Sequence, residues 1–256
     1  MQSNVATWTD PDFVAYYAKQ TRLQPPEARI LEELRPLLAS WSMLDVGVGG
    51  GRTTRHFAPA VADYVGVDIS PSMVAHCSRH FGSRNCRFEV MDARELARLG
   101  RHRFDFVLFS WNGLDYVTHD DRLRALGQIH EVCRPGAFFC FSTHNILALA
   151  HVMRRPSIST NPVRLWRSVG NWLRWRRTHA LAVAQVAAQR REWAVVDDGT
   201  HESRMETYYV RPDAQLAQLE PAFGGIRVFS RSGEELARED LDSAEDDWLY
   251  YLCQAR

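Results

Sequence analysis

Short apolar runs alternate with helical patterns between residues 27 and 145 of the chain. Between the runs, apolar side chains recur at helical spacing, as Leu123, Leu126 and Ile129 do within 120–133. The runs themselves are four to seven residues long and rich in β-branched and aromatic residues, which is typical of buried strands. The first begins at Met43 and runs into Asp45, and the others lie at 62–67, 86–90, 103–109 and 137–142. Strands that alternate with helices predict a parallel sheet with right-handed crossovers.

The two ends of the chain add further elements. Residues 11–39 are predicted to be helical, with a break at Pro25-Pro26 and a second helix over 27–39. Near the C-terminus, 212–219 reads as a helix, and Phe223-Gly224-Gly225 reads as a break. Extended segments are predicted at 192–196, 205–210, 226–230 and 248–253.

A glycine-rich turn follows the first strand. Asp45 closes the strand, and glycines follow at 47, 49, 50 and 51 before a helix is predicted to start near Arg52. A strand, a glycine turn and a helix N-terminus form the nucleotide site of doubly wound α/β domains. The dinucleotide fingerprint does not fit, because Arg52 stands at its third glycine. A carboxylate at this point repels a pyrophosphate but suits a ligand with ammonium and sulfonium groups.

Two more acids stand where predicted strands end. Asp68 closes the second strand, 23 positions after Asp45, and an acid there can accept hydrogen bonds from both hydroxyls of a ribose. Ser70 is the better N-cap for the helix that follows, which leaves Asp68 free for a ligand. Asp92 follows the third strand.

The spacing Asp45-x-Gly47-x-Gly49-x-Gly51 resembles motif I of the class I S-adenosylmethionine-dependent methyltransferases. The order helix, Arg134-Pro135-Gly136, strand resembles the same segment of that family. The resemblance covers about residues 40–145, and it implies S-adenosylmethionine as the cofactor. It assigns the ribose to Asp68, and the adenine to Ile69, Met73, Asp92 and the backbone of Ala93. Ser110, in the loop after the fourth strand, is a further predicted cofactor contact.

The predicted fold is therefore a doubly wound α/β sheet of seven mostly parallel strands, whose last strand is inserted antiparallel. A helical and extended lid is expected between strands five and six. We expect one domain in three parts, formed by the N-terminal helices and cofactor-binding core, the acceptor lid, and the end of the sheet. Their boundaries are 1–145, 146–210 and 211–256. Tyr16, Tyr17 and Arg22, from the first helices, are candidates to line the cofactor site.

The lid is unusually basic. Nine arginines and no acid lie between Asn145 and Arg191, with Trp166, Trp172 and Trp175 among them. Such a segment could bind an acidic or phosphorylated acceptor, stack on a base, or lie on an anionic membrane surface. The alternative is a structural cap, whose charge is neutralised within the chain or across a homodimer by the eight acids of 234–247.

Composition narrows the class of protein. The 256 residues carry a formal net charge of zero, which argues against general attraction to nucleic acid. No apolar run reaches the ~20 residues of a membrane span, and the first ten residues do not form a signal peptide. The five cysteines form no C-x-x-C pair. We interpret them as mostly buried, reduced thiols in a cytoplasmic protein without a metal site.

The candidate chemistry lies after strands four and five. For an oxygen or nitrogen acceptor, a base must remove a proton, and His144 is the first candidate. Tyr116, Asp115 and His119 follow as further candidates. Three residues are predicted to orient the acceptor: Asn112, Asn145 and, from the lid, His201.

The predicted function is methyl transfer to oxygen or nitrogen of a small molecule, such as a sugar, nucleotide-sugar or secondary metabolite. No N-P-P-Y motif follows the fourth strand, where S-W-N-G stands instead. Two rivals stay open. One is an RNA or DNA methyltransferase that uses the arginine-rich lid, and the other is a non-catalytic protein that binds the cofactor.

Overall fold

The computed structural model describes residues 8–149, 160–178, 191–198 and 205–256. Its centre is a parallel half-sheet in the order β3-β2-β1-β4-β5, and each neighbouring pair is parallel. The order reverses between β1 and β4, which is the switch point where open α/β sheets bind ligands. These strands are β1 (Ser42–Val46), β2 (Asp63–Asp68), β3 (Cys86–Val90), β4 (Phe104–Phe109) and β5 (Cys133–Asn145).

The C-terminal strands complete the expected topology. β10 (Trp248–Ala255) lies antiparallel between β5 and β8 (Phe223–Phe229), so the last strand is inserted as the sequence predicts. Seven strands thus form the expected core sheet.

The count of seven is nevertheless too low, because three short strands join the sheet. β9 (Glu235–Leu236) pairs with β8. β6 (Trp193–Val196) and β7 (Thr207–Val210), in two of the predicted extended segments, pair antiparallel as a hairpin. β7 also runs parallel to the end of β5, which makes ten strands in all. The hairpin is therefore part of the sheet and stands directly at the ligand edge.

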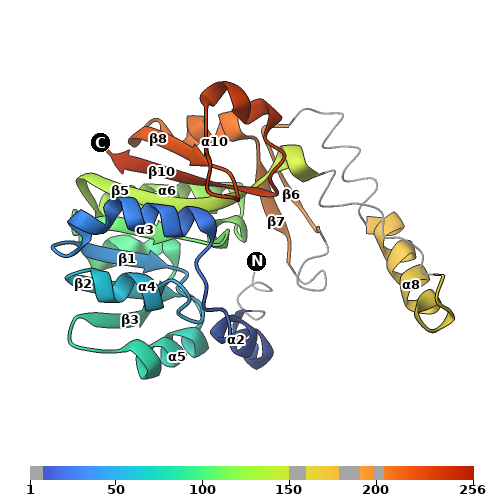
Figure 1. Ribbon diagram of the computed structural model, residues 1–256, viewed down its shortest axis with the longest axis horizontal. Coiled ribbons are helices and arrows are strands. Elements are labelled where there is room, and N and C mark those ends of the chain that lie inside the picture. The colour runs from blue at the N-terminus through green and yellow to red at the C-terminus, as the bar shows by residue number, and fades with distance from the viewer. Residues whose placement is uncertain (1–7, 150–159, 179–190, 199–204) are drawn as a thin grey trace.

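Helices cover both faces of the sheet (Figure 1). One face packs on α6 (His119–Val132) and α10 (Pro212–Leu219), and the other on α3 (Pro25–Leu38), in two separate apolar cores. α4 (Thr54–Phe57) and α5 (Pro71–Phe81) follow β1 and β2. α2 (Pro11–Ala18) lies near the end of β1, and α8 (Pro162–Thr178) stands apart from the sheet.

Several predicted boundaries need correction. The glycines after Phe223 do not interrupt the secondary structure, because β8 continues through them. Gly225 adopts a φ of +57° within the strand. Arg134-Pro135-Gly136 lies inside β5, as a bulge between the pairs Phe104↔Cys133 and Phe106↔Phe138. After β3, residues Ala93–Leu99 form a 3-10 helix.

Candidate functional site

A cavity of about 360 Å³ opens at the carboxyl edge of the sheet, over β1, β2 and β4. Nine of the ten predicted cofactor residues line it: Asp45, Gly47, Gly49, Asp68, Ile69, Met73, Asp92, Ala93 and Ser110. The tenth, Gly51, supports the loop from outside the lining. The cavity therefore lies where the strand ends predict it.

The glycine loop needs glycine for two physical reasons. Gly47, Gly49 and Gly51 have φ of +66°, +54° and +82°, a region that side chains with a Cβ rarely adopt. A Cβ on Gly51 would stand 2.3 Å from the ring of Phe81 on α5. On Gly49 the nearest atom would be 3.9 Å away. Gly51 thus lets α5 approach the loop, while Gly49 leaves space in front of it.

Asp68 is buried at the end of β2 and is less free than the sequence suggests. Ser70 does cap α5, as predicted. However, the backbone N–H groups of Gly49 and Ser70 each donate to one oxygen of Asp68, both at 2.8 Å. Each carboxylate oxygen can accept a second hydrogen bond. Burial raises the pKa of Asp68, and these backbone bonds oppose the rise. The carboxylate is held in place with lone pairs to spare for two hydroxyls.

Asp45 is fully enclosed at the end of β1. Thr53 Oγ1 and Tyr64 Oη both donate to its Oδ2, each at 2.5 Å. Burial raises the pKa of Asp45 to about 6, although these two bonds act to lower it. Among the described residues, Oδ1 keeps its acceptor capacity. That capacity suits a donor such as an ammonium group.

Asp92 is partly occupied by its own neighbour. The guanidinium of Arg94 donates two hydrogen bonds to its carboxylate, from Nε to Oδ1 at 2.9 Å and from Nη2 to Oδ2 at 2.6 Å. Burial alone would raise the pKa of Asp92, but the bonds from Arg94 prevail and lower it. The carboxylate is therefore ionised, and an adenine amino group would share it with Arg94.

Sequence reasoning missed a buried ion pair beneath the loop. Arg52 donates to both carboxylate oxygens of Glu27 on α3, and its Nη2 lies 3.0 Å from Ser110 Oγ. Tyr250 donates to Glu27 as well, at 2.9 Å. The Arg52 guanidinium also lies 4.9 Å from the centre of the Trp111 ring. No short-range pattern links Glu27 with a residue 25 positions later, so only the docking of α3 shows this pair.

Aromatic side chains form the outer wall of the cavity. Trp8 contacts Tyr17 and Tyr116 edge-on, with ring centres 5.8 and 5.2 Å apart, and Tyr17 contacts Trp111 at 5.5 Å. Of the three predicted N-terminal residues, Tyr17 lines the cavity. Tyr16 is exposed, while the carbonyl of Arg22 accepts from Arg52 at 3.2 Å.

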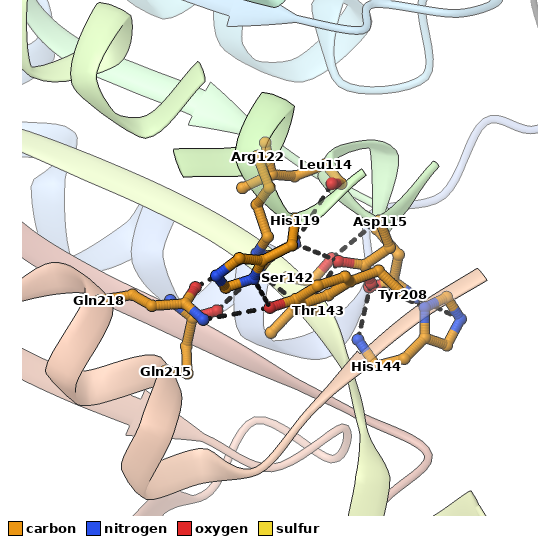
Figure 2. A network of polar contacts seen from close by, with 11 residues as sticks. Leu114, Asp115, His119, Arg122, Ser142, Thr143, His144, Tyr208, Gln215 and Gln218 are labelled. Atoms are coloured by element: carbon orange, nitrogen blue, oxygen red, sulfur yellow. Dashed lines mark hydrogen bonds and ion pairs between the residues drawn. The ribbon is translucent and has the colours of Figure 1, made fainter. Parts of the chain in front are cut away.

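Beside this wall, the predicted base sits in a buried network (Figure 2). The carboxylate of Asp115 binds both the backbone N–H and Nδ1 of His144, each at 2.7 Å through Oδ2. Its Oδ1 accepts from Arg122 Nη1 at 2.5 Å and from Thr143 Oγ1 at 2.7 Å. Arg122 continues to Gln215 Oε1 at 2.6 Å. This carboxylate fixes the His144 ring and favours the tautomer with its proton on Nδ1.

Asn112 lies against the opposite nitrogen of that ring. Its Nδ2 is 3.2 Å from His144 Nε2, and its Oδ1 is buried without a partner among the described residues. Both Trp111 and Asn112 have φ near +55°, at 53° and 60°. Non-glycine residues adopt this region rarely and often at functional sites. The loop after β4 is therefore shaped to hold Asn112 on His144.

Of the remaining predicted residues, Asn145 and His119 contact different parts of the chain. Asn145 does not line the cavity, since its amide donates to the carbonyls of Ala244 and Asp246 and its Oδ1 caps Leu147. His119 bonds Tyr208 Oη at 2.8 Å and stacks on Trp193, on the hairpin side of the network. His201 lies outside the described residues.

Comparison with known proteins explains this arrangement. Residues 43–136 match the family described as "Methyltransferase domain". These residues hold β1, the glycine loop, Asp68, Asp92 and the Asp115 loop.

This match supports the resemblance of the core to the class I S-adenosylmethionine-dependent methyltransferases. The chain is 29% identical over 131 residues to the malonyl-[acyl-carrier protein] O-methyltransferase of Pseudescherichia vulneris. It is 34% identical over 122 residues to the ubiquinone biosynthesis O-methyltransferase of Azorhizobium caulinodans. These matches cover 50% and 46% of the chain, and the chain spans about half the length of either relative (48% and 45%).

Solved methyltransferases share the fold across nearly the whole chain. One is an S-adenosylmethionine-dependent methyltransferase from Clostridium acetobutylicum, with a TM-score of 0.63, 15% identity, and coverage of 95% of this chain and 97% of its own. Another is the 1,6-didemethyltoxoflavin-N1-methyltransferase of Burkholderia thailandensis, solved with S-adenosylhomocysteine. Its TM-score is 0.58 at 18% identity, with coverage of 99% and 88%. At these identities the likeness concerns the fold.

Proposed function

We propose that the protein transfers the methyl group of S-adenosylmethionine to an oxygen or nitrogen atom of a small molecule. The observation that carries this proposal is the position of the Asp115–His144 pair, next to the wall of a cavity that suits the cofactor. The curated relatives are named as O-methyltransferases, and one structural neighbour is named as an N-methyltransferase of a small molecule.

The chemical types of the cavity residues and their positions along the cavity suit the parts of the cofactor. Asp68 would accept from the ribose hydroxyls, and Asp45 Oδ1 would face the ammonium group. Ile69 and Met73 would pack on the adenine, beside Asp92. The bound cofactor supplies an electrophilic methyl group, so the chain has only to position the acceptor and remove its proton.

His144 is proposed as the base that removes the proton. With Nδ1 donating to Asp115, the neutral ring carries its lone pair on Nε2. Asn112 Nδ2 lies against that lone pair, at the position that an acceptor O–H or N–H would take. Asp115 stabilises the ring again once it is protonated, because the carboxylate stands on its far side.

Tyr116 is a donor rather than a second base. Its ring lines the cavity, and its centre is 6.5 Å from that of His144. Burial raises the pKa of Tyr116 far above its ordinary value, so the phenol keeps its proton. We propose that it helps to hold the acceptor between cofactor and base.

The acceptor is proposed to be uncharged. An acidic or phosphorylated acceptor would need a free cation at the cavity. Among the described lining residues, Arg52 is paired with Glu27 and Arg94 is paired with Asp92 and Asp121. Because both of these arginines are paired with acids, a hydroxyl or amine of a neutral molecule fits the cavity better.

The test is a transfer assay with isotopically labelled S-adenosylmethionine, over hydroxyl and amine acceptors, with RNA as a separate arm. His144→Ala and Asp115→Asn should lower the rate on the accepted molecule by about 100-fold or more, the scale of general base catalysis. His80→Ala, at an exposed histidine on α5, is the matched control. Cofactor binding without transfer to any acceptor would favour a non-catalytic protein, and transfer to RNA alone would favour the nucleic-acid rival.

A further inference from the structure

Helix α8 exposes an apolar strip that the function proposed above does not use. Leu165, Trp166 and Leu173 are 38%, 84% and 46% exposed. At about 100° per residue, these three positions fall within about 100° of the helix circumference. Figure 1 shows α8 standing apart from the sheet and its covering helices. The three residues thus share one side of the helix, unlike the single exposed apolar residues of most soluble proteins.

All the charged residues of the same helix are positive. The 17 residues of α8 include five arginines and no acid, and the wider stretch from 146 to 191 has nine arginines and no acid. Arg176 falls within the arc of the apolar strip. A short helix that combines exposed tryptophan and leucine with an excess of arginine is typical of helices that lie in a membrane interface.

Two of the eight acids expected to neutralise this charge are engaged elsewhere. The acids of 234–247 were expected to neutralise the lid. In the described part of the chain, Glu235 pairs with Arg29 and Arg227, and Asp247 pairs with Arg231. Their ion pairs therefore tie the end of the sheet to α3 and to itself, and none of the described pairs reaches α8.

We propose that α8 lies on an anionic membrane surface, with Leu165, Trp166 and Leu173 inserted below the headgroups and the arginines near lipid phosphates. None of the described helices is long and apolar enough to cross a bilayer. Lipid fits better than nucleic acid because the exposed strip is largely aliphatic, and leucine gains nothing from bases or phosphates. A helix of 17 residues is about 25 Å long, enough to lie flat on the surface.

The experiment is co-sedimentation of the full chain with vesicles. It measures the bound fraction of the protein and requires no catalytic activity. We expect binding to vesicles of phosphatidylcholine mixed with phosphatidylglycerol, weakening as salt rises. Binding to phosphatidylcholine alone should be at least about ten-fold weaker, because the arginines then lack anionic partners. The double variant Trp166→Glu with Leu173→Glu should weaken binding to the mixed vesicles about ten-fold or more.

Two controls separate the surface from the fold. Leu37→Glu introduces one such charge at another exposed apolar position, on α3, and should bind vesicles as the wild type does. The double variant should keep the wild-type thermal unfolding and S-adenosylhomocysteine affinity. Brominated phosphatidylglycerol should quench tryptophan fluorescence, and Trp166→Phe should lose part of that quenching while still binding.

Three results would overturn the proposal. They are equal binding to both kinds of vesicle, unchanged binding of the double variant, and salt-sensitive binding to single-stranded RNA without binding to vesicles. The last would assign α8 to nucleic acid. None of these results depends on methyl transfer. They therefore do not test the proposed function, which the transfer assay tests separately.

Discussion

At the scale of single residues, the site is organised by buried charges that neighbouring groups hold in place. Asp115 and Arg122 are both 0% exposed and form an ion pair, and His144 and Thr143 take the other hydrogen bonds of that carboxylate. A buried ion pair is costly to form but far more costly to break, since the remaining charge has no partner. Arg122 is therefore a positioning residue for the proposed base.

Arg122→Met should lower the free energy of unfolding by about 3–5 kcal/mol, because it leaves the Asp115 carboxylate buried and unpaired. Arg124→Met is the matched control, at an exposed position on the same helix, and should change stability by less than about 0.5 kcal/mol. Urea unfolding measures both. Equal stabilities for the two variants would show that Arg122 does not support Asp115.

Asp45 should make cofactor binding depend on pH. Its pKa is about 6 in the folded chain, chiefly through burial, against ~3.9 for an unfolded aspartate. The ammonium group of the ligand is attracted to the ionised form, so affinity should rise as the pH rises through about 6. Stability without ligand has the opposite sign. Between the two pKa values only the folded state keeps the proton, so stability falls as the pH rises through that window.

Calorimetry with S-adenosylhomocysteine between acid and neutral pH measures the first effect. Asp45→Asn should bind more weakly at neutral pH, and its affinity should no longer change near pH 6. A wild-type affinity that is flat across this range would remove Asp45 as the partner of the ammonium group.

Sequence predicts the residues of the site where they follow directly from strand ends. Asp45 is the penultimate residue of β1 and Asp68 is the last residue of β2, and the carboxyl ends of parallel strands meet at one edge. Glu27 and Arg52 could not be found in this way, because their contact depends on how α3 docks. The amide of Asn145 was equally hidden, since its partners lie 99 and 101 positions away.

At the scale of elements, proline and local pattern fix some boundaries well. The prediction for β3 matches the structure residue by residue, and so does that for α10, which starts at Pro212. The extended segments predicted at 192–196 and 205–210 contain β6 and β7, whereas β9 has two residues, too few to set a pattern. That β7 pairs with the end of β5 follows from long-range packing alone.

The element that closes the cofactor cavity is α2. The backbone of Tyr17 and Ala18 lies so close to the glycine loop that a Cβ on Gly50 would meet it at 2.5 Å. The Tyr17 side chain lines the cavity as well. We therefore interpret α2 as a cover held directly on the loop.

Gly50→Ala should displace α2 and weaken S-adenosylhomocysteine binding by about ten-fold, or 1.4 kcal/mol. Gly127→Ala is the matched control, since its Cβ would meet nothing within 4 Å. It lies inside α6 and should raise stability by about 0.5–1 kcal/mol without changing affinity. Calorimetry and urea unfolding compare them. Wild-type affinity in Gly50→Ala would show that α2 does not cover the bound cofactor.

At the scale of the whole molecule, the chain combines a common core with an uncommon insertion. The core carries the cofactor cavity at the switch point and the Asp115–His144 pair at the next strand ends. Between β5 and β7 the insertion adds α8, and the hairpin attached to it reaches back to β5. The core was predictable from motif spacing, whereas the role of the insertion needs the exposure of its side chains.

The central claim is that the cavity binds S-adenosylmethionine through Asp68. The most direct test is calorimetric titration of the purified chain with S-adenosylmethionine and S-adenosylhomocysteine, beside Asp68→Ala and, as an exposed control, Asp120→Ala. We predict binding of both ligands that Asp68→Ala weakens by about ten-fold or more, or about 1.4 kcal/mol, and that Asp120→Ala leaves unchanged. Absence of binding by the wild-type chain would contradict the account.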